Sequence, residues 1–375
     1  MQAEMPYPEM TPSDPLGPLK IIRVSVPGVG LHGVLAVDNV AAGPAIGGLR
    51  MAPDVDAREA ARLARAMTLK NALAGIPHGG AKSVIAADPR LPPHEKETLV
   101  RAIACALRGE RDYIFGPDMG TDEAAMGWVK DEIGRAVGLP RELGGIPLDE
   151  IGATGWGVRH AAEVAAGFCG VHLVGARVAV QGFGAVGRHA AHFLVDRGAV
   201  LVAASDSGCT RYAADGLDVA KLIAFKTAGG ELADYDAGER LPRDAVIEVD
   251  CDIWIPAARP DVIRADNADR LRARLVIEGA NIAVTADAAA MLHARGVLVV
   301  PDIVANAGGV ICAALEYAGA TEAAAMAAIE ERLRANTEAM LKEARAAGIA
   351  PREAAMRLAM RRIERAMQSR RWKLF

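Results

Sequence analysis

Short apolar runs and longer helical periods alternate along the chain, and their order predicts an α/β protein. Near the N-terminus, β-like runs at residues 21–26 and 33–37 are punctuated by glycine and proline. Between residues 57 and 75, apolar positions recur at i, i+4, i+7 and i+11, the period of an amphipathic helix. A second helical period follows at residues 92–108, and residues 113–118 read as a short strand that leads into a turn.

The pattern changes near residue 150, which we take as a domain boundary. From there, short apolar strands alternate with helices, as expected for a doubly wound parallel sheet. The residues from 152 to 157 lead into a predicted helix at 158–168. The predicted strands of this part are 177–181, 200–204, the end of 245–256, 275–281 and 297–300.

A glycine-rich loop joins the first of these strands to a helix. It has the G-x-G-x-x-G form, and we expect all six of its residues to contact a dinucleotide: Gly182, Phe183, Gly184, Ala185, Val186 and Gly187. The glycines permit a tight turn, and the helix N-terminus offers free N–H groups to a pyrophosphate. Asp206 ends the next strand and is placed to accept from the adenosine ribose, so NAD is predicted over NADP. Ser205, Ser207 and Thr210 beside it could serve a 2′-phosphate, which leaves NADP open.

Two asparagines lie beyond later strands of the same part. Asn281 and Asn306 each follow a predicted strand. Ligands of doubly wound sheets bind outside the carboxyl ends of the strands. We therefore expect both asparagines to contact the cofactor.

Lysines in apolar surroundings predict a second site in the first part. Lys82 follows Gly79 and Gly80 in a predicted glycine-rich turn and precedes an apolar run. The two glycines are expected to let a ligand approach the backbone. Desolvation lowers the pKa of an ammonium, which suits a lysine that exchanges protons. Lys70 falls on the apolar stripe of the 57–75 helix, and Asp118 lies just past a strand. The two lysines together indicate a site for an anionic substrate. Asp118 is a third candidate for this site, with an Asx-type turn residue as the alternative interpretation.

Composition excludes several other classes of protein. The net charge of −4 over 375 residues gives no basic field for nucleic acid. The five dispersed cysteines favour reduced thiols in the cytoplasm, and the eight histidines show no metal-binding spacing. For that reason no metal is expected. The pattern shows no signal peptide and no apolar run long enough to cross a bilayer, so no membrane association is expected.

Taken together, these motifs resemble the glutamate, leucine, phenylalanine and valine dehydrogenase superfamily. The resemblance runs from about Gly43 to Glu316, and its motifs are Gly47-Gly48-Leu-Arg50, Met67-Thr-Leu-Lys70, Gly79-Gly-Ala-Lys82, Pro117-Asp-Met-Gly-Thr121, Ala153-Thr-Gly155, the glycine-rich loop, Glu278-Gly-Ala-Asn281 and Asn306-Ala-Gly-Gly309. It implies that Lys70 binds the substrate α-carboxylate, that Lys82 is the catalytic lysine and that Asp118 shuttles protons. Gly47 and Gly48 are expected at the substrate, and Thr154 at the nicotinamide.

The same resemblance implies the domain organisation. Residues 1–150 and about 331–375 would form a substrate-binding and oligomerisation domain, and residues 151–330 an NAD-binding, Rossmann-like domain. The domains would face each other across a cleft, with the C-terminal helices returning to the first. A homo-oligomer is expected, with residues 20–50 as candidates for the interface.

Two departures from the family pattern bear on the substrate. Glutamate-specific members have a lysine where Ile46 stands and a serine where Ala313 stands, and both hold the γ-carboxylate. A buried unpaired carboxylate costs several kcal/mol, whereas each buried CH₂ contributes about 0.8 kcal/mol. Ile46 and Ala313 therefore favour an apolar substrate, although residues 204–208 and 299–302 look closer to glutamate members.

We accordingly expect NAD-dependent, reversible oxidative deamination of an apolar L-amino acid to its 2-oxo acid and ammonia, with glutamate as the alternative substrate. Two other hypotheses stay open. One is a non-catalytic dinucleotide sensor on the same scaffold. The other is a 2-hydroxy acid dehydrogenase, which relies on a histidine, but His78 has no obvious carboxylate partner.

Overall fold

The computed structural model describes residues 14–369, and the chain divides into two compact units. The first unit takes residues up to Ala72, those from Ile76 to Gly145, and those from Ile363 onward. The second takes Leu73–Gly75 and Ile146–Arg362. This division differs from the expected one near the C-terminus, because residues 331–362 group with the second unit. Residues 1–13 and 370–375 of the expected domains lie outside the described part.

The first unit is built on a five-stranded mixed sheet in the order β1-β2-β4-β3-β5. Strands β1 and β2 pair antiparallel, as do β2 and β4, whereas β3 runs parallel to both β4 and β5. Its strands are β1 (Lys20–Val26), β2 (Leu31–Asn39), β3 (Ala45–Ala52), β4 (Gly80–Ala86) and β5 (Tyr113–Pro117).

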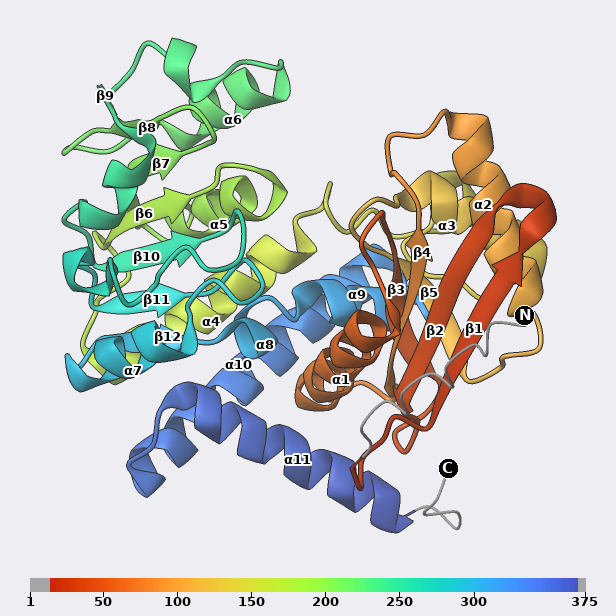
Figure 1. Ribbon diagram of the computed structural model, residues 1–375. Helices are drawn as coiled ribbons and strands as arrows, with labels where there is room; N and C mark the ends of the chain where they lie inside the picture. The colour runs from red at the N-terminus through yellow and green to blue at the C-terminus, as the bar shows by residue number, and fades with distance from the viewer. Residues whose placement is uncertain (1–13, 370–375) are drawn as a thin grey trace. The chain divides into compact units, whose positions relative to one another are not determined.

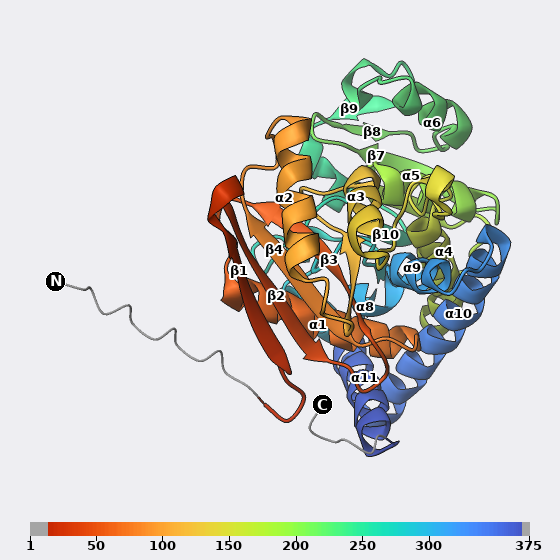
Figure 2. The same ribbon diagram turned by 90° about the vertical axis from the view of Figure 1, so that its right-hand side faces the viewer.

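Helices cover both faces of this sheet, as Figures 1 and 2 show. Helix α1 (Ala57–Ala74) packs small residues, among them Ala60 and Ala64, against β2 and β4 on one face. Helices α2 (Pro93–Ala106) and α3 (Glu123–Ile133) cover the other face and bury its larger side chains. Helix α3 begins at Asp122, whose carboxylate accepts from the Ala125 N–H at 2.9 Å, so acidic residues do open this helix.

The second unit is built on a seven-stranded sheet in the order β12-β11-β10-β6-β7-β8-β9. The five strands from β12 to β7 are parallel, and β8 and β9 extend the sheet antiparallel. The strands are β6 (Arg177–Gln181), β7 (Val200–Ser205), β8 (Thr210–Tyr212), β9 (Glu239–Leu241), β10 (Ile253–Pro256), β11 (Leu275–Ile277) and β12 (Leu298–Val300).

Helices α4 and α5 pack against one face of the parallel strands, and short 3₁₀ segments with α7 cover the other. The helices of this unit are α4 (Ala153–Cys169), α5 (Ala185–Val195), α6 (Val219–Thr227), α7 (Ala286–Ala294), α8 (Asp302–Ala305), α9 (Gly308–Tyr317) and α10 (Glu322–Ala347). Helix α11 (Pro351–Ser369) starts in the second unit and ends in the first. No helix within residues 14–369 is long and apolar enough to cross a membrane.

Two local expectations were wrong. Helix α4 begins at Ala153, so Thr154 lies in its first turn rather than in the segment before it. Lys82 lies within β4 and not in a glycine-rich turn, because the strand starts at Gly80 and pairs with β2 and β3.

Candidate active site and cofactor site

The side chains of Lys82 and Asp118 meet in the first unit. The Lys82 Nζ lies 2.6 Å from the Asp118 Oδ1, and the lysine side chain is only 5% exposed. Lys82 lies on β4, and Asp118 comes directly after the end of β5. Strand β3 lies between these two strands in the sheet. The structure therefore brings together the two residues that were expected to move protons.

Arg50 is a third member of this cluster, with no role assigned from the sequence although it ends the Gly47-Gly48-Leu-Arg50 motif. Its Nε donates to the Asp118 Oδ2 at 2.7 Å, and its Nη1 donates to Glu59 at 2.7 Å. The Asp118 N–H donates to the Thr121 hydroxyl at 3.0 Å, and that hydroxyl donates to the Leu49 carbonyl at 2.7 Å. Asp118 is thus held at its backbone and at both carboxylate oxygens.

The pKa values of Lys82 and Asp118 are both lower than usual, but for different reasons. Burial lowers the pKa of Lys82 and outweighs the opposing effect of Asp118, while the Arg50 charge lowers it further. Burial alone would raise the pKa of Asp118, but Lys82 and Arg50 together hold it below its usual value. The arrangement favours an ionised Asp118 beside a lysine that gives up its proton more readily than a surface lysine does.

The contact between Lys82 and Asp118 requires glycine at position 48. A Cβ on Gly48 would lie 2.7 Å from the Asp118 Cβ and 3.1 Å from the Lys82 Nζ, so only glycine leaves room for the pair. A Cβ on Gly47 would lie 1.7 Å from the Ala81 carbonyl oxygen. Gly47 therefore serves close packing of β3 on β4.

Gly79 and Gly80 also serve packing, which corrects the expectation that they clear space for a ligand. A Cβ on Gly79 would meet the Asn39 carbonyl oxygen at 1.8 Å. A Cβ on Gly80 would meet the Thr68 backbone nitrogen at 2.0 Å. Protein backbone already occupies the space that these glycines leave.

Lys70 lies in the last turns of α1 and is half-buried. The fully buried positions of α1 include Ala60, Ala64, Asn71 and Leu73, and the two alanines pack against β2 and β4. Lys70 borders these positions, and Leu63 and Met67, the apolar residues expected on its stripe, are only half-buried.

His78 contacts the loop that precedes β3. Its Nδ1 lies 2.9 Å from the Pro44 carbonyl oxygen, and burial lowers the pKa of its imidazole. A carbonyl partner does not orient a histidine for acid–base work in the way a carboxylate does. This contact weighs against the 2-hydroxy acid hypothesis.

In the second unit, the glycine-rich loop adopts the geometry of a dinucleotide site. Gly182 has a φ of +93°, and Gly184 begins α5 without a side-chain cap. A Cβ on Gly184 would meet nothing within 4 Å, whereas one on Gly187 would lie 2.0 Å from the Gly182 carbonyl oxygen. The loop is thus open at Gly184 and closely packed at Gly187, which leaves the first N–H groups of α5 available to a phosphate.

Asp206 lies directly after β7, as expected. Its Oδ1 accepts from the N–H of Gly208 at 2.9 Å, and its Oδ2 accepts from Leu232 N–H at 3.0 Å and Lys226 Nζ at 3.1 Å. Burial would raise the pKa of Asp206, but these donors hold it below its usual value. Lys226 was not identified from the sequence, because α6 is separate from every motif.

Asn281 and Asn306 meet near the ends of β11 and β12. The Asn306 Nδ2 donates to the Asn281 Oδ1 at 2.8 Å, and the Asn306 Oδ1 is buried with no partner among the described residues. A Cβ on Gly309 would lie 3.3 Å from the Thr154 hydroxyl, so the start of α9 approaches the start of α4. A carboxamide N–H donor would satisfy the Asn306 oxygen, and a nicotinamide supplies one.

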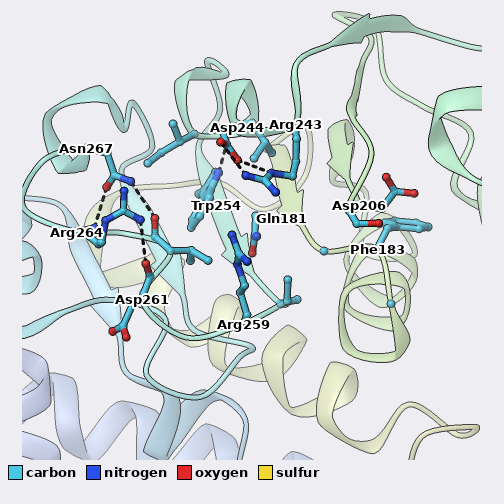
Figure 3. A pocket seen from close by; sticks show the side chains of 18 of the residues that line it. Gln181, Phe183, Asp206, Arg243, Asp244, Trp254, Arg259, Asp261, Arg264 and Asn267 are labelled. Carbon is cyan, nitrogen blue, oxygen red and sulfur yellow. Dashed lines mark hydrogen bonds and ion pairs between the residues drawn. The ribbon is translucent and has the colours of Figure 1, made fainter. Parts of the chain in front are cut away.

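A cavity of about 630 Å³ opens at the ends of β6, β7 and β10, beside the 3₁₀ segments (Figure 3). Its wall includes Gly182, Gly184, Asp206, Lys226 and Trp254, whereas Asn281 and Asn306 do not line it. A cavity of this size with a phosphate-binding loop at one side fits a dinucleotide. Within residues 14–369 no group of three or more His, Cys, Asp or Glu side chains could hold a metal ion.

Ile46 and Ala313 do not come together within either unit. Ile46 lies on β3 of the first unit and is 3% exposed, and Ala313 lies on α9 of the second and is 8% exposed. Both side chains are nearly buried, so each presents little surface to a substrate.

Comparison with known proteins agrees with this arrangement. Residues 144–371 match the family described as Glutamate/Leucine/Phenylalanine/Valine dehydrogenase, and residues 18–135 match its dimerisation domain. The glutamate dehydrogenase of Aeropyrum pernix is 38% identical over 89% of this chain and 85% of its own length. The NADP(+)-dependent glutamate dehydrogenase of Pyrobaculum calidifontis is 38% identical over 95% of this chain and 92% of its own.

Among solved structures, the hetero-hexameric glutamate dehydrogenase of Thermus thermophilus in its Leu-bound form superposes with a TM-score of 0.81. The two sequences are 33% identical, and the superposition covers 93% of this chain and 89% of the Thermus thermophilus chain. The two-domain α/β fold agrees with these matches. The chain therefore belongs to the glutamate/leucine/phenylalanine/valine dehydrogenase family and is an NAD(P)-dependent amino-acid dehydrogenase that acts on CH–NH₂ groups.

Proposed function

We propose that this enzyme oxidatively deaminates L-glutamate to its 2-oxo acid and ammonia, reversibly, with Lys82 and Asp118 as the proton-transferring pair. A dinucleotide held at the glycine-rich loop would supply the acceptor for the hydride from Cα. The 2.6 Å contact between Lys82 and Asp118 carries the chemical part of the proposal. Lys82, with its lowered pKa, takes a proton from the attacking water, and Asp118 moves protons as ammonia leaves. Lys70 pairs with the substrate α-carboxylate.

The choice of glutamate reverses the order of the two substrates expected from Ile46 and Ala313. The relatives described above are glutamate dehydrogenases and share 38% identity along most of their length. Ile46 and Ala313 therefore weigh less against glutamate than their chemistry alone suggests.

A panel of kcat/KM values tests the substrate. L-glutamate, leucine, valine, phenylalanine and tryptophan are compared at fixed NAD, and the reverse reaction is run with and without ammonia. We expect glutamate to lead the panel and the reverse reaction to require ammonia. An apolar amino acid at the head of the panel would reject glutamate and leave the proton-transfer roles intact.

An apolar L-amino acid is the second candidate, and Ile46 is the observation that favours it. If an apolar side chain binds beside Ile46, then Ile46→Lys reduces kcat/KM for that substrate and raises it for glutamate, because the lysine supplies a partner for the γ-carboxylate. If glutamate is already the substrate, the same change gives no such exchange of preference.

We further propose that NAD is preferred over NADP. The ionised Asp206 lines the cavity and repels a 2′-phosphate, while its oxygens accept from a ribose hydroxyl. Lys226, at 3.1 Å from Asp206, offsets part of that negative charge. Asp206→Ala should shift preference toward NADP, because Lys226 is then released to pair with the 2′-phosphate. Kinetics of both proteins with both cofactors decide this; a wild-type preference for NADP contradicts the proposal.

Assembly belongs to the same proposal. The match of residues 18–135 to a dimerisation domain supports a homo-oligomer, and β1 is the edge strand of the first unit's sheet. An exposed edge strand offers unpaired backbone groups to a second chain. The free cysteines favour a reducing compartment, so we place the enzyme in the cytoplasm.

A further inference from the structure

The cavity at the glycine-rich loop has an excess of positive charge. Its lining contains the cations Lys226, Arg243, Arg259, Arg264 and Arg270 and the carboxylates Asp206, Asp244 and Asp261, which leaves two positive charges in excess. Such a surface favours a doubly charged anion. The question is which cation is available to it.

Four of the five cations are already paired. Lys226 pairs with Asp206 at 3.1 Å, Arg243 with Asp244 at 2.7 Å, Arg264 with Asp266 at 3.0 Å and Arg270 with Glu248 at 2.5 Å. Arg259 has no ion pair or hydrogen bond among the described residues, and its charge reaches Asp244 only through a longer-range effect on the pKa of that carboxyl. Arg259 is therefore the cation of the cavity wall with free donors.

The backbone around Arg259 lies directly on the phosphate-binding loop. The Ala257 N–H donates to the Gln181 carbonyl at 2.7 Å, and a Cβ on Gly182 would lie 2.6 Å from the Ala258 Cβ. In Figure 3 the Arg259 side chain points toward the end of β6, where Gln181 stands. Gly184, at the N-terminus of α5 where no side chain caps the helix, lines the same cavity as Arg259.

We propose that Arg259 binds the cofactor pyrophosphate, completing on the β10 side the site that α5 forms on the β6 side. The guanidinium offers a planar set of donors that matches two phosphate oxygens. This inference rests on the use of NAD(P) and not on the identity of the amino acid.

Binding of cofactor fragments tests the assignment, and isothermal titration needs no turnover. Adenosine, AMP, ADP, 2′,5′-ADP and NADH are titrated into wild-type enzyme, Arg259→Gln and Arg259→Lys. Arg272→Gln is the matched control, because Arg272 is an exposed arginine of the same unit that does not line the cavity. Circular dichroism and melting temperature establish that each variant folds.

For Arg259→Gln we expect Kd to rise about tenfold for ADP and NADH, as for the loss of a charged hydrogen bond, and adenosine binding to be unchanged. Arg259→Lys should recover part of the ADP affinity, and Arg272→Gln should match wild type. Equal ADP affinity in Arg259→Gln and wild type would overturn the proposal. A loss that is the same for adenosine as for ADP, or confined to 2′,5′-ADP, would also overturn it, because Arg259 would then contact the adenosine or the 2′-phosphate. Absence of NADH binding to the wild-type enzyme would instead reject the cofactor itself.

Discussion

At the scale of single residues, the reactive centre of the first unit consists of a carboxylate between two cations. Asp118 gives one oxygen to Lys82 and the other to Arg50, at 2.6 and 2.7 Å. A carboxylate held at both oxygens cannot rotate away, so the lysine that it contacts is also fixed in place. Proton transfer between fixed partners needs little reorganisation.

Removing either proton-transferring group should therefore stop the reaction without affecting the cofactor. For Lys82→Met and Asp118→Asn we expect kcat to fall by roughly 10²- to 10⁴-fold, the usual contribution of a positioned acid or base. The Kd for NADH should stay at its wild-type value, because the glycine-rich loop lies in the other unit. Lys130→Ala changes an exposed lysine of α3 and serves as the control. Wild-type turnover in either variant would remove that residue from the mechanism.

Arg50 should set the pH at which the enzyme becomes active. Its charge lowers the pKa of Lys82, in addition to the larger effect of burial. Arg50→Met removes that charge, so the pKa of Lys82 rises and the alkaline rise of kcat/KM for deamination moves to higher pH. Glu59 acts in the opposite sense on Lys82, and Glu59→Gln should move the same rise to lower pH. Profiles that coincide for both variants would show that Lys82 does not govern this limb.

At the scale of elements, the start of α11 is fastened to two loops at the strand ends of the second unit. Arg352 donates to Glu278 at 3.0 Å and to Asp302 at 2.7 Å. The other Asp302 oxygen accepts from the Ile282 N–H at 2.8 Å, where Ile282 has a φ of +51°. Left-handed backbone is unfavourable for a β-branched residue, so this cluster holds the segment after Asn281 in a strained form.

Glu278 makes the stability of this cluster depend on pH. Burial raises its pKa to about 7; Asp302 adds to that effect, and Arg352 opposes it. The folded protein then keeps a proton that the unfolded chain loses near pH 4.5, so stability falls as pH rises from about 4.5 to 7. Glu278→Gln should remove this contribution. Urea unfolding at several pH values measures it, and curves that fall in parallel for wild type and variant would contradict the assignment.

The pattern of the sequence predicted the elements better than it predicted their contacts. Strand β6 has the expected bounds, and the glycine-rich loop and Asp206 lie where the motif placed them. Lys226 and Arg352 were missed, because each reaches its partner from a helix distant in sequence and carries no motif of its own. The stripe expected on α1 included Leu63 and Met67, which are only half-buried, and it left out the buried Ala60 and Ala64, because a hydrophobic period gives alanine little weight.

At the scale of the whole molecule, the two units divide the work. The first holds Lys82 and Asp118, the pair proposed to transfer protons, and matches the family's dimerisation domain. The second holds the glycine-rich loop and the cavity. The ion pairs of Asp118 with Lys82 and Arg50 lie within the first unit, and the pair of Asp206 with Lys226 lies within the second. Each site can therefore be altered and measured by itself.

The solution mass tests the assembly. Each chain has a mass of 39.2 kDa, so multi-angle light scattering at assay concentration should give an integral multiple of that mass greater than one. The physical reason is the edge strand β1, whose outer backbone groups lack a neighbour within the sheet. A mass of one chain would contradict the use of residues 18–135 for dimerisation.

Gly48 shows that the presence of all reactive side chains does not by itself establish that a protein is active. The distance between Lys82 and Asp118 depends on a hydrogen atom at Gly48, where a methyl group would lie 2.7 Å from the Asp118 Cβ. A homologous gene that encodes alanine there would keep every acid, base and glycine-rich loop, and its product would still hold the pair apart. Pseudoenzymes of this kind would pass a search for catalytic side chains, since what they have lost is an empty space.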